Sequence, residues 1–296
     1  AKCTTGAERA ASSGDSSGDS GAAARYTAGM IEQATIAAAI SGFTTDTDRW
    51  RAVPAAEFAA NGITVEGAPE RVALYLRDGI RDARVTLVPP AEGQTRVFIG
   101  NNLRGTLRAA LRCAGSTLYL GDNCSFNALT IRSRQPGDLV ACGNDVAVTG
   151  PGTWISGLEA SPGRPALVVG DCCLFAADVT LRNSDGHPVL DRGSGEITNA
   201  PTRGILIEPH AWLGERSAVL KDVTIGAFAR VGFGSVVTRN LPRYAVARGV
   251  PATFRVDSDR YWAWDGSETG RARAAAFLER FPPGAGPQPE SPESRD

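Results

Sequence analysis

An aliphatic side chain recurs at every sixth position between residues 207 and 237. This spacing is neither the alternation of a strand nor the period of about 3.6 residues of an amphipathic helix, so it indicates a larger repeating unit. The residue four positions after each aliphatic one is small or β-branched. The aliphatic positions are Ile207, Leu213, Val219, Ile225, Val231 and Val237, and the small positions are Ala211, Ser217, Val223, Ala229 and Ser235.

Each six-residue unit predicts one short strand and a turn. Three units would form one triangular coil, and coils stacked about 4.8 Å apart would place the aliphatic side chain on the axis and the small one at a corner. The same phase recurs upstream at Leu120, Phe126, Val169, Phe175 and Leu181, with Cys124, Thr130, Cys173 and Val179 in the small positions. The predicted fold class is therefore an all-β solenoid, a parallel β-helix of hexapeptide repeats.

The solenoid is expected to span residues 97–240, after a less regular N-terminal part. Residues 1–28 are rich in Gly, Ser and Ala and predict a disordered arm. Residues 29–96 predict either a cap or irregular first coils. Within this part, a helix is expected at 26–40 and a short helix at 53–58.

After the repeat, residues 241–281 predict a segment that returns across the last coil and then a helix from about residue 271 to residue 281. The tail at 282–296 is rich in Pro, Gly and Ser and is expected to be disordered.

Charge and hydropathy argue against a nucleic-acid-binding protein and against a membrane protein. The net charge is −1 and the basic residues are almost all arginines, with lysine only at Lys2 and Lys221, so no cationic stripe favours nucleic acid. The sequence shows no apolar run of 18 residues and no basic-then-apolar leader. We therefore expect no membrane span and a cytoplasmic protein.

The chain has six cysteines and two histidines, His187 and His210. Cys124 and Cys173 fall on small inward positions and Cys172 adjoins them, which favours packed thiols over a disulfide framework. No CxxC motif is present, and two histidines are too few for a Cys/His zinc cluster, so no metal site is expected.

The regular repeat is interrupted once, at residues 183–204, which read NSDGHPVLDRGSGEITNAPTRG. A loop of about 20 residues inside a compact repeat suggests a functional role. It carries His187, with Asp185 and Asp191 nearby. The loop is therefore the candidate site.

Four segments of the chain resemble the left-handed β-helix acyltransferases, in particular the branch of sugar and polysaccharide O-acetyltransferases. They are S-D-G-H-P-V at 184–189, H-A-W-L-G at 210–214, L-K-D-V-T-I-G at 220–226 and V-G-F-G-S-V-V-T at 231–238. The R-G-V-P-A segment at 248–252 completes a match that covers about residues 166–256. The resemblance implies a homotrimer that transfers an acetyl group from acetyl-CoA to a hydroxyl of a sugar, a glycan or a polysaccharide precursor.

By this resemblance His187 is the general base, a role that suits imidazole because it titrates near neutral pH. Asp185 or Asp191 is expected either to orient the imidazole or to cap a turn. His210 is expected to form a wall of the cleft rather than to act as a second base and, with Asp191, to face the acceptor. Trp212 corresponds to the family's aromatic residue beside the thioester, with packing between subunits as the alternative.

The resemblance also implies where the coenzyme binds. Backbone N–H groups near Glu215 and Phe233 would bind its amides, with Gly232 allowing close approach, and Arg239 would lie near its phosphates. Two positions depart from the family pattern: Glu208 stands where glycine is expected, and Thr253 replaces a basic residue for which Arg248 or Arg255 could substitute.

Three other functions share part of this sequence pattern. N-acetylation of an amino sugar nucleotide would use a histidine base equally well. A carbohydrate-binding or scaffold solenoid without activity would share the repeat. A γ-class carbonic anhydrase needs three zinc-binding histidines across an interface, and two histidines in the chain argue against it.

Overall fold

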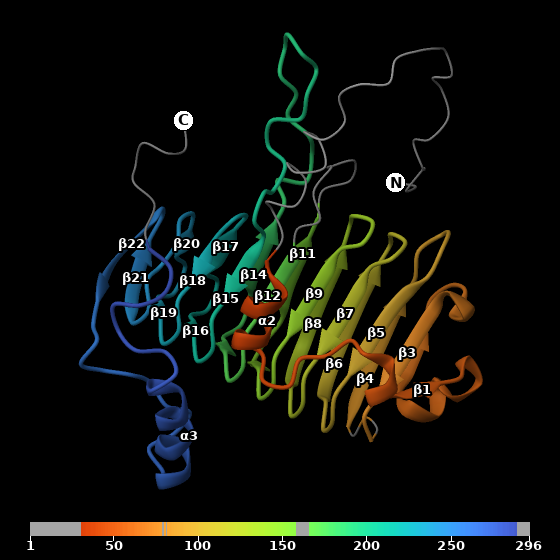
Figure 1. Cartoon of the computed structure of the whole chain (residues 1–296), viewed down its shortest axis with the longest axis horizontal. Coiled ribbons are helices and arrows are strands. Elements are labelled where there is room, and N and C mark those ends of the chain that lie inside the picture. Colours follow the sequence, from red (N-terminus) through yellow and green to blue (C-terminus); the bar gives the residue numbers. More distant parts are fainter. Residues whose placement is uncertain (1–30, 79, 81, 158–165, 289–296) are drawn as a thin grey trace.

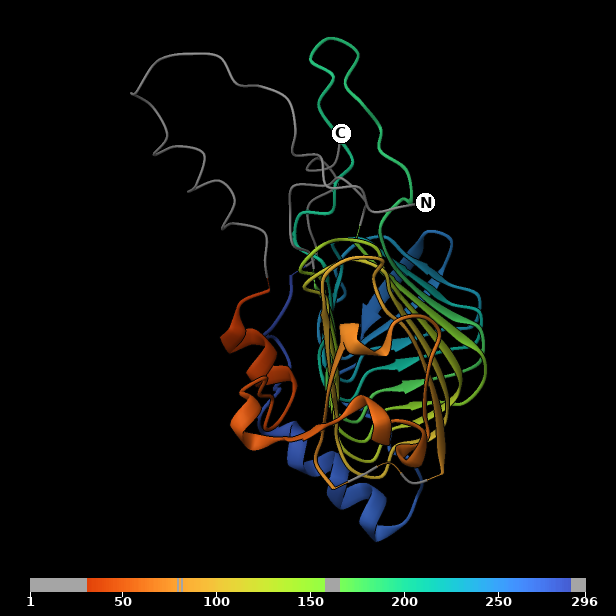
Figure 2. The ribbon, with the colours of Figure 1, turned by 90° about the vertical axis from the view of Figure 1, so that its right-hand side faces the viewer.

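A stack of parallel coils forms the body of the protein (Figure 1). The computed structural model describes residues 31–78, 80, 82–157 and 166–288. In the last coils the paired residues are 18 positions apart, as for Leu206 with Thr224 and Trp212 with Arg230. One coil therefore consists of three hexads, and the predicted period is confirmed. A view along the stack shows the coils superposed around a common interior (Figure 2).

The coils have three faces. The first face is an eight-stranded sheet of β1 (Arg51–Val53), β3 (Val72–Leu76), β5 (Thr95–Ile99), β7 (Thr117–Leu120), β9 (Leu139–Cys142), β12 (Ala166–Val169), β15 (Ile205–Ile207) and β18 (Thr224–Ile225). The second face contains β10 (Ala147–Val148), β13 (Leu174–Phe175), β16 (Trp212–Leu213), β19 (Arg230–Val231), β21 (Ala245–Gly249) and β22 (Ala252–Val256).

The third face contains β2 (Ile63–Val65), β4 (Ala83–Val88), β6 (Arg104–Leu111), β8 (Ser125–Ser133), β11 (Gly152–Ser156), β14 (Val179–Asn183), β17 (Ala218–Leu220) and β20 (Val236–Val237). The second and third faces form one continuous sheet, because β8 runs through a corner and pairs with β10 on one side and with β11 on the other.

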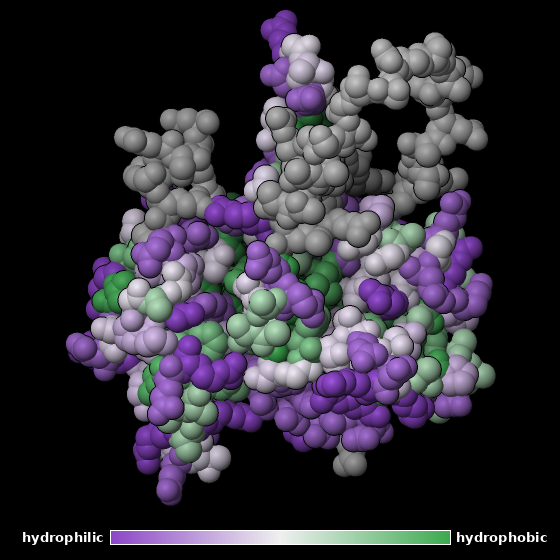
Figure 3. Space-filling model, viewed as in Figure 1, coloured by the Kyte–Doolittle hydropathy of each residue, from purple (hydrophilic) through white to green (hydrophobic). Residues whose placement is uncertain are grey.

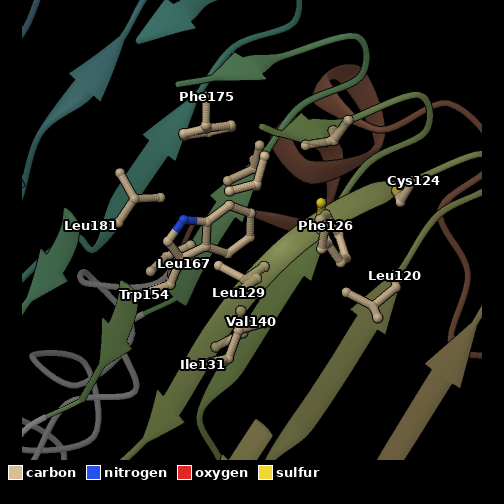
Figure 4. Packing of buried hydrophobic residues seen from close by; sticks show 14 of the residues in the cluster. Leu120, Cys124, Phe126, Leu129, Ile131, Val140, Trp154, Leu167, Phe175 and Leu181 are labelled. Atoms are coloured by element: carbon tan, nitrogen blue, oxygen red, sulfur yellow. The ribbon is translucent and has the colours of Figure 1, made fainter. Parts of the chain in front are cut away.

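The interior of the stack holds the side chains that the hexad phase predicts. All six aliphatic residues from Ile207 to Val237 are at most 3% exposed, and the five small residues between them are at most 1% exposed. The large rings lie further upstream, where Trp154 packs between Phe126 and Phe175 at centroid distances of 6.4 and 5.3 Å (Figure 4). Apolar burial along one axis therefore holds the coils together.

The prediction that Thr130 occupies an inward position is wrong. Thr130 is half-buried, and its neighbours Leu129 and Ile131 fill the axis instead. Ala128 has a φ of 66°, and the pairing of β6 with β8 shifts register at this corner. The extra corner residues therefore displace the hexad phase.

The C-terminal segment covers one corner of the stack. Cys172, His210, Phe228 and Tyr244 occupy this corner in successive coils, with φ between 57° and 61°. The helix α3 (Glu268–Leu278) packs against them through its apolar side. The predicted helix is present and starts three residues earlier, since the Ser267 side chain accepts a hydrogen bond from the Gly270 N–H at 3.0 Å.

The N-terminal segment covers the outer side of the first face. Phe98 and Tyr119 point away from the axis but are fully buried, because the helix α2 (Gln33–Ala39) and Trp50 pack over them.

The short helix predicted at 53–58 is not an α-helix: Val53 ends β1, and a 3₁₀ turn follows at Ala55–Glu57. Further 3₁₀ turns lie at Thr47–Arg49, Ala59–Asn61 and Pro69–Arg71. Residues 26–30 of the first predicted helix, the arm at 1–28 and the tail beyond residue 288 lie outside the described residues.

Antiparallel strands adjoin the first and last coils. β1 pairs antiparallel with β3, and β22 pairs antiparallel with β21, with Arg248 opposite Thr253. All the other strand pairings among the described residues are parallel.

The predicted packed thiols are confirmed, since Cys124, Cys172 and Cys173 are free and buried, as is Cys142. Burial raises the pKa of the Cys172 thiol to about 12, so it stays protonated. Cys113 does not belong to this set, because it is disulfide-bonded. None of the described helices is long and apolar enough to cross a membrane.

Candidate active site

The candidate loop, residues 184–204, leaves the stack between β14 and β15 and projects from it (Figure 1). Its outer part is a hairpin, in which the Thr198 N–H donates to the Val189 oxygen at 2.8 Å and Leu190 forms a bridge with Ile197. Hydrophilic side chains gather at its end (Figure 3). The loop is therefore an ordered projection that begins and ends at one corner of the prism.

The base of the loop is fixed to the next coil by Asp222. Its Oδ1 accepts hydrogen bonds from the backbone N–H groups of Thr202, Arg203 and Gly204 at 2.8, 2.6 and 3.0 Å. Gly204 has a φ of 91°, and a Cβ there would overlap the carbonyl oxygen of Ala166. The return of the chain to the stack thus requires glycine at this position.

His187 lies in the first limb of the loop and its side chain is exposed. Its backbone oxygen accepts a hydrogen bond from Asn199 Nδ2 at 3.0 Å. Within residues 31–78, 80, 82–157 and 166–288, no group forms a hydrogen bond with its imidazole. The ring is therefore available to a bound molecule.

The two loop carboxylates bind other partners than the imidazole. Asp185 accepts hydrogen bonds from Lys221 Nζ and from Asn199 Nδ2, the latter at 2.9 Å. Partial burial opposes its ionisation, but these two donors hold the pKa of Asp185 below its usual value. Asp191 caps a turn, since its Oδ1 accepts from the backbone N–H groups of Gly193 and Ser194 at 2.8 and 2.7 Å. The structure therefore shows no direct contact that orients the His187 ring.

His210 is not at the surface, and the prediction that it forms a cleft wall and faces the acceptor is wrong. It is fully buried, its Nε2 lies 2.9 Å from the Trp262 oxygen, and its ring stacks on the Trp262 ring at 4.4 Å. Burial lowers the pKa of His210 to about 4, so the ring is neutral. Its role is to hold the C-terminal segment against the corner at residues 208–211.

Several residues expected at the coenzyme meet at the corner of residues 214–217 and 232–235. The Gly234 N–H donates to the Glu215 oxygen at 2.9 Å, and the Arg216 guanidinium lies 5.6 Å from the centre of the Phe233 ring. Phe233 is 65% exposed. A Cβ on Gly232 would lie 3.6 Å from the Arg248 Cβ. The structure thus places Glu215, Gly232 and Arg248 near the exposed ring of Phe233.

Trp212 and Arg239 lie at other places on the coil. Trp212 lies on β16 in the second face, where its side chain is 41% exposed. Because Val219 pairs with Val237, Arg239 follows one coil after Lys221, at the corner from which the loop leaves.

The departure at Glu208 has a structural explanation. Its carboxylate accepts hydrogen bonds from Nε and Nη2 of Arg243 at 2.7 and 2.8 Å and from the Ala227 N–H at 2.8 Å. Both side chains of the ion pair are only 13% exposed. Glu208 therefore ties the segments around Ala227 and Arg243 to its own coil. At the other departure, Arg255 lies 3.5 Å from Asp257, while Thr253 is exposed.

The order of the corners around one coil shows how far apart His187 and Trp212 are attached to the prism. The chain passes the corner at 208–211, then β16, the corner at 214–217, β17 and the corner at 221–223, where the loop is held. In a triangular coil this last corner is the one that the face of β16 does not touch. His187 and Trp212 of one chain are therefore attached to opposite sides of the prism. Among the described residues, no group of three or more His, Cys, Asp or Glu side chains could hold a metal ion.

Comparison with known proteins gives acetyltransferases. No family model matches the chain. The polysialic acid O-acetyltransferase of Escherichia coli O1:K1 is 32% identical over 132 residues, which are 44% of this chain and 42% of the relative. The galactoside O-acetyltransferase of Escherichia coli strain K12 is 39% identical over 97 residues, 32% of this chain and 46% of the relative. Over part of their length, the chain is similar to O-acetyltransferases.

A solved structure shows the same fold. The crystal structure of the polySia-specific acetyltransferase NeuO matches with a TM-score of 0.61 over 73% of this chain and 97% of its own, at 20% identity. The predicted left-handed β-helix is thereby confirmed. The chain spans less than half the length of the two relatives named above.

Proposed function

We propose that the protein transfers an acetyl group from acetyl-CoA to a hydroxyl of a sugar, glycan or related small acceptor, with His187 as the general base. The observation that carries the proposal is the exposed imidazole of His187, which forms no hydrogen bond with any described residue, on a loop that is itself held in place. Similarity to O-acetyltransferases of polysialic acid and of galactosides supports the donor and the acceptor class.

The chemistry needs one proton acceptor near the acceptor hydroxyl. As the hydroxyl oxygen attacks the thioester carbonyl, the imidazole of His187 takes its proton. The tetrahedral oxyanion then collapses, the carbon–sulfur bond breaks, and the departing thiolate takes up the proton. No acyl-enzyme is required. Release of free thiol from acetyl-CoA in the presence of candidate sugars measures the reaction directly, and release with amino sugars alone would favour the N-acetyltransferase alternative.

We further propose that the active unit is a homotrimer with each site shared between two subunits. His187 and Trp212 of one chain are attached to opposite sides of the prism, so a cleft that contains both needs a second chain. The N-terminal segment already covers the first face, which leaves the second and third faces for side-by-side packing. A ring of three such contacts closes on itself.

Subunit mixing tests the shared site. His187→Ala and Trp212→Ala proteins are each expected to be inactive, but their mixture should recover activity after subunit exchange. In an equal mixture, about one contact in four would join an intact His187 to an intact Trp212. The measurement is thiol release with time after mixing, with the mass of each assembly determined by light scattering. A fully active monomer would contradict the proposal, as would a demonstrated exchange that restores no activity.

Arg239 is proposed to bind the phosphates of the coenzyme. Arg239→Ala should raise the KM for acetyl-CoA with little change in kcat, because a contact to the remote phosphates is equally strong in the ground and transition states. Arg271→Ala, which removes an exposed arginine on α3, serves as the control. A donor truncated to acetyl-pantetheine should be used equally well by wild type and by Arg239→Ala. An equal loss with the truncated donor would assign Arg239 a structural role instead.

A further inference from the structure

The backbone around His187 is held by one side chain that the sequence motifs do not include. Asn199 lies on the second limb of the hairpin, opposite His187 and directly after Thr198. Its Nδ2 donates to the Asp185 carboxylate at 2.9 Å and to the His187 backbone oxygen at 3.0 Å. Its Oδ1 accepts from the Val189 N–H at 2.7 Å. An asparagine amide offers two N–H donors and one carbonyl acceptor, and all of them are used here.

These contacts hold alternate residues of the first limb of the loop. Asp185, His187 and Val189 are all bound to Asn199, so the residues on both sides of the imidazole are held together with its own backbone. The ring has no hydrogen-bond partner in the part of the chain that the structure describes, whereas the backbone that carries it is fixed at three points. Asn199 therefore restricts where the imidazole can lie without occupying its nitrogen atoms.

Lys221 connects this arrangement to the rigid stack. Its ammonium group donates to the Asp185 carboxylate and, at 2.8 Å, to the Asn199 backbone oxygen. Lys221 follows β17 at the corner where Asp222 holds the returning limb of the loop. It is one of only two lysines in the chain, in which 31 residues are Lys or Arg. A compact ammonium group with three donors suits two acceptors that lie on different limbs.

We propose that Asn199, supported by Lys221, is the positioning residue for His187, acting on the loop backbone rather than on the imidazole. This inference rests on the proposed role of His187 as the base. A neighbouring carboxylate would bind the ring directly, but Asp185 is already engaged by Lys221 and Asn199. Positioning is therefore achieved through the main chain, which leaves both ring nitrogens for the substrate.

Asn199→Ala is expected to lower kcat about 10- to 100-fold, because displacing a reacting group by about 1 Å costs up to about 10²-fold in rate. The KM for acetyl-CoA should change less than about twofold, since the proposal gives Asn199 no part in binding the donor. Thr198→Ala is the matched control: its hydroxyl donates to the Val189 oxygen at 3.1 Å within the same hairpin, yet it does not hold His187. It should retain the wild-type kcat.

Imidazole NMR tests the position of His187 without any assay of activity. The chain has two histidines, so two ring signals are expected, and the buried His210 reports on the integrity of the stack. In Asn199→Ala and in Lys221→Met the His187 signal should change in shift and line width, while the His210 signal stays unchanged. Lys221→Arg, which keeps the charge, should restore part of the wild-type signal.

A double variant separates positioning from general damage. If Asn199 acts through His187, adding Asn199→Ala to His187→Ala should cause no further loss of the residual rate. An unchanged His187 signal in Asn199→Ala would overturn the proposal, as would a further loss of rate in the double variant. Near wild-type turnover of His187→Ala would instead refute the proposed function, and the NMR signals would still decide whether Asn199 holds the loop.

Discussion

Replacing His187 by alanine is expected to lower kcat by about 10²- to 10⁴-fold while leaving the affinity for acetyl-CoA almost unchanged. Without the imidazole, the acceptor hydroxyl must lose its proton to water as it attacks the thioester. The side chain is exposed and forms no hydrogen bond within the described part of the protein, so its removal leaves no unsatisfied buried group. The loss should therefore be chemical rather than structural. The measurement is thiol release from acetyl-CoA with an accepted sugar.

Two controls distinguish a loss of chemistry from a loss of structure. Arg192→Ala removes an exposed side chain at the end of the same loop and should keep wild-type turnover. Thermal unfolding of His187→Ala should match that of wild type, because the loop hairpin and its anchors are untouched. Turnover of His187→Ala within a few-fold of wild type would mean that another group removes the proton.

The largest effect on stability is expected at Trp154. Trp154→Ala should reduce the free energy of unfolding by about 3–5 kcal/mol, the range found when a large buried aromatic side chain is removed. The indole is fully buried on the axis, where it contacts the rings of Phe126 and Phe175 (Figure 4). Strands above and below fix the backbone, so the cavity can close only in part.

Chemical denaturation followed by circular dichroism gives the change in free energy. Trp154→Phe is the matched control, because it keeps a ring between the two phenylalanines and should lose much less. Among the described residues the indole Nε1 has no hydrogen-bond partner, so Phe also removes an unsatisfied donor. A loss below about 1 kcal/mol in Trp154→Ala would show that the coils collapse into the space.

The interior of the last coils could be predicted almost residue by residue. A solenoid places each hexad in the same environment, so the phase read at Ile207 holds through Val237. The prediction fails where corners gain residues, as at Thr130, because the period no longer fits. It also does not identify Trp154, since an indole between two rings follows from the space in that coil and not from the repeat.

The candidate site was predictable only in part. A loop that breaks a regular repeat and carries a histidine stands out in the sequence, and the structure places His187 on an ordered projection. The burial of His210 does not follow from the sequence, because the hexad phase does not say which corner the C-terminal segment covers. Asn199 and Lys221 could not be found, since their contacts with Asp185 depend on the path of the folded loop and join residues 14 and 36 positions apart.

The antiparallel strands β1 and β22 also bear on how copies of this protein can associate. The open end of a parallel stack presents unpaired N–H and C=O groups, which would template a further coil from another molecule and lead to fibres. An antiparallel strand has a different hydrogen-bond spacing from a parallel one. On the faces that end in β1 and β22, the pattern that a parallel coil would need is therefore no longer offered. On these two faces the ends of the stack are therefore protected from end-to-end polymerisation.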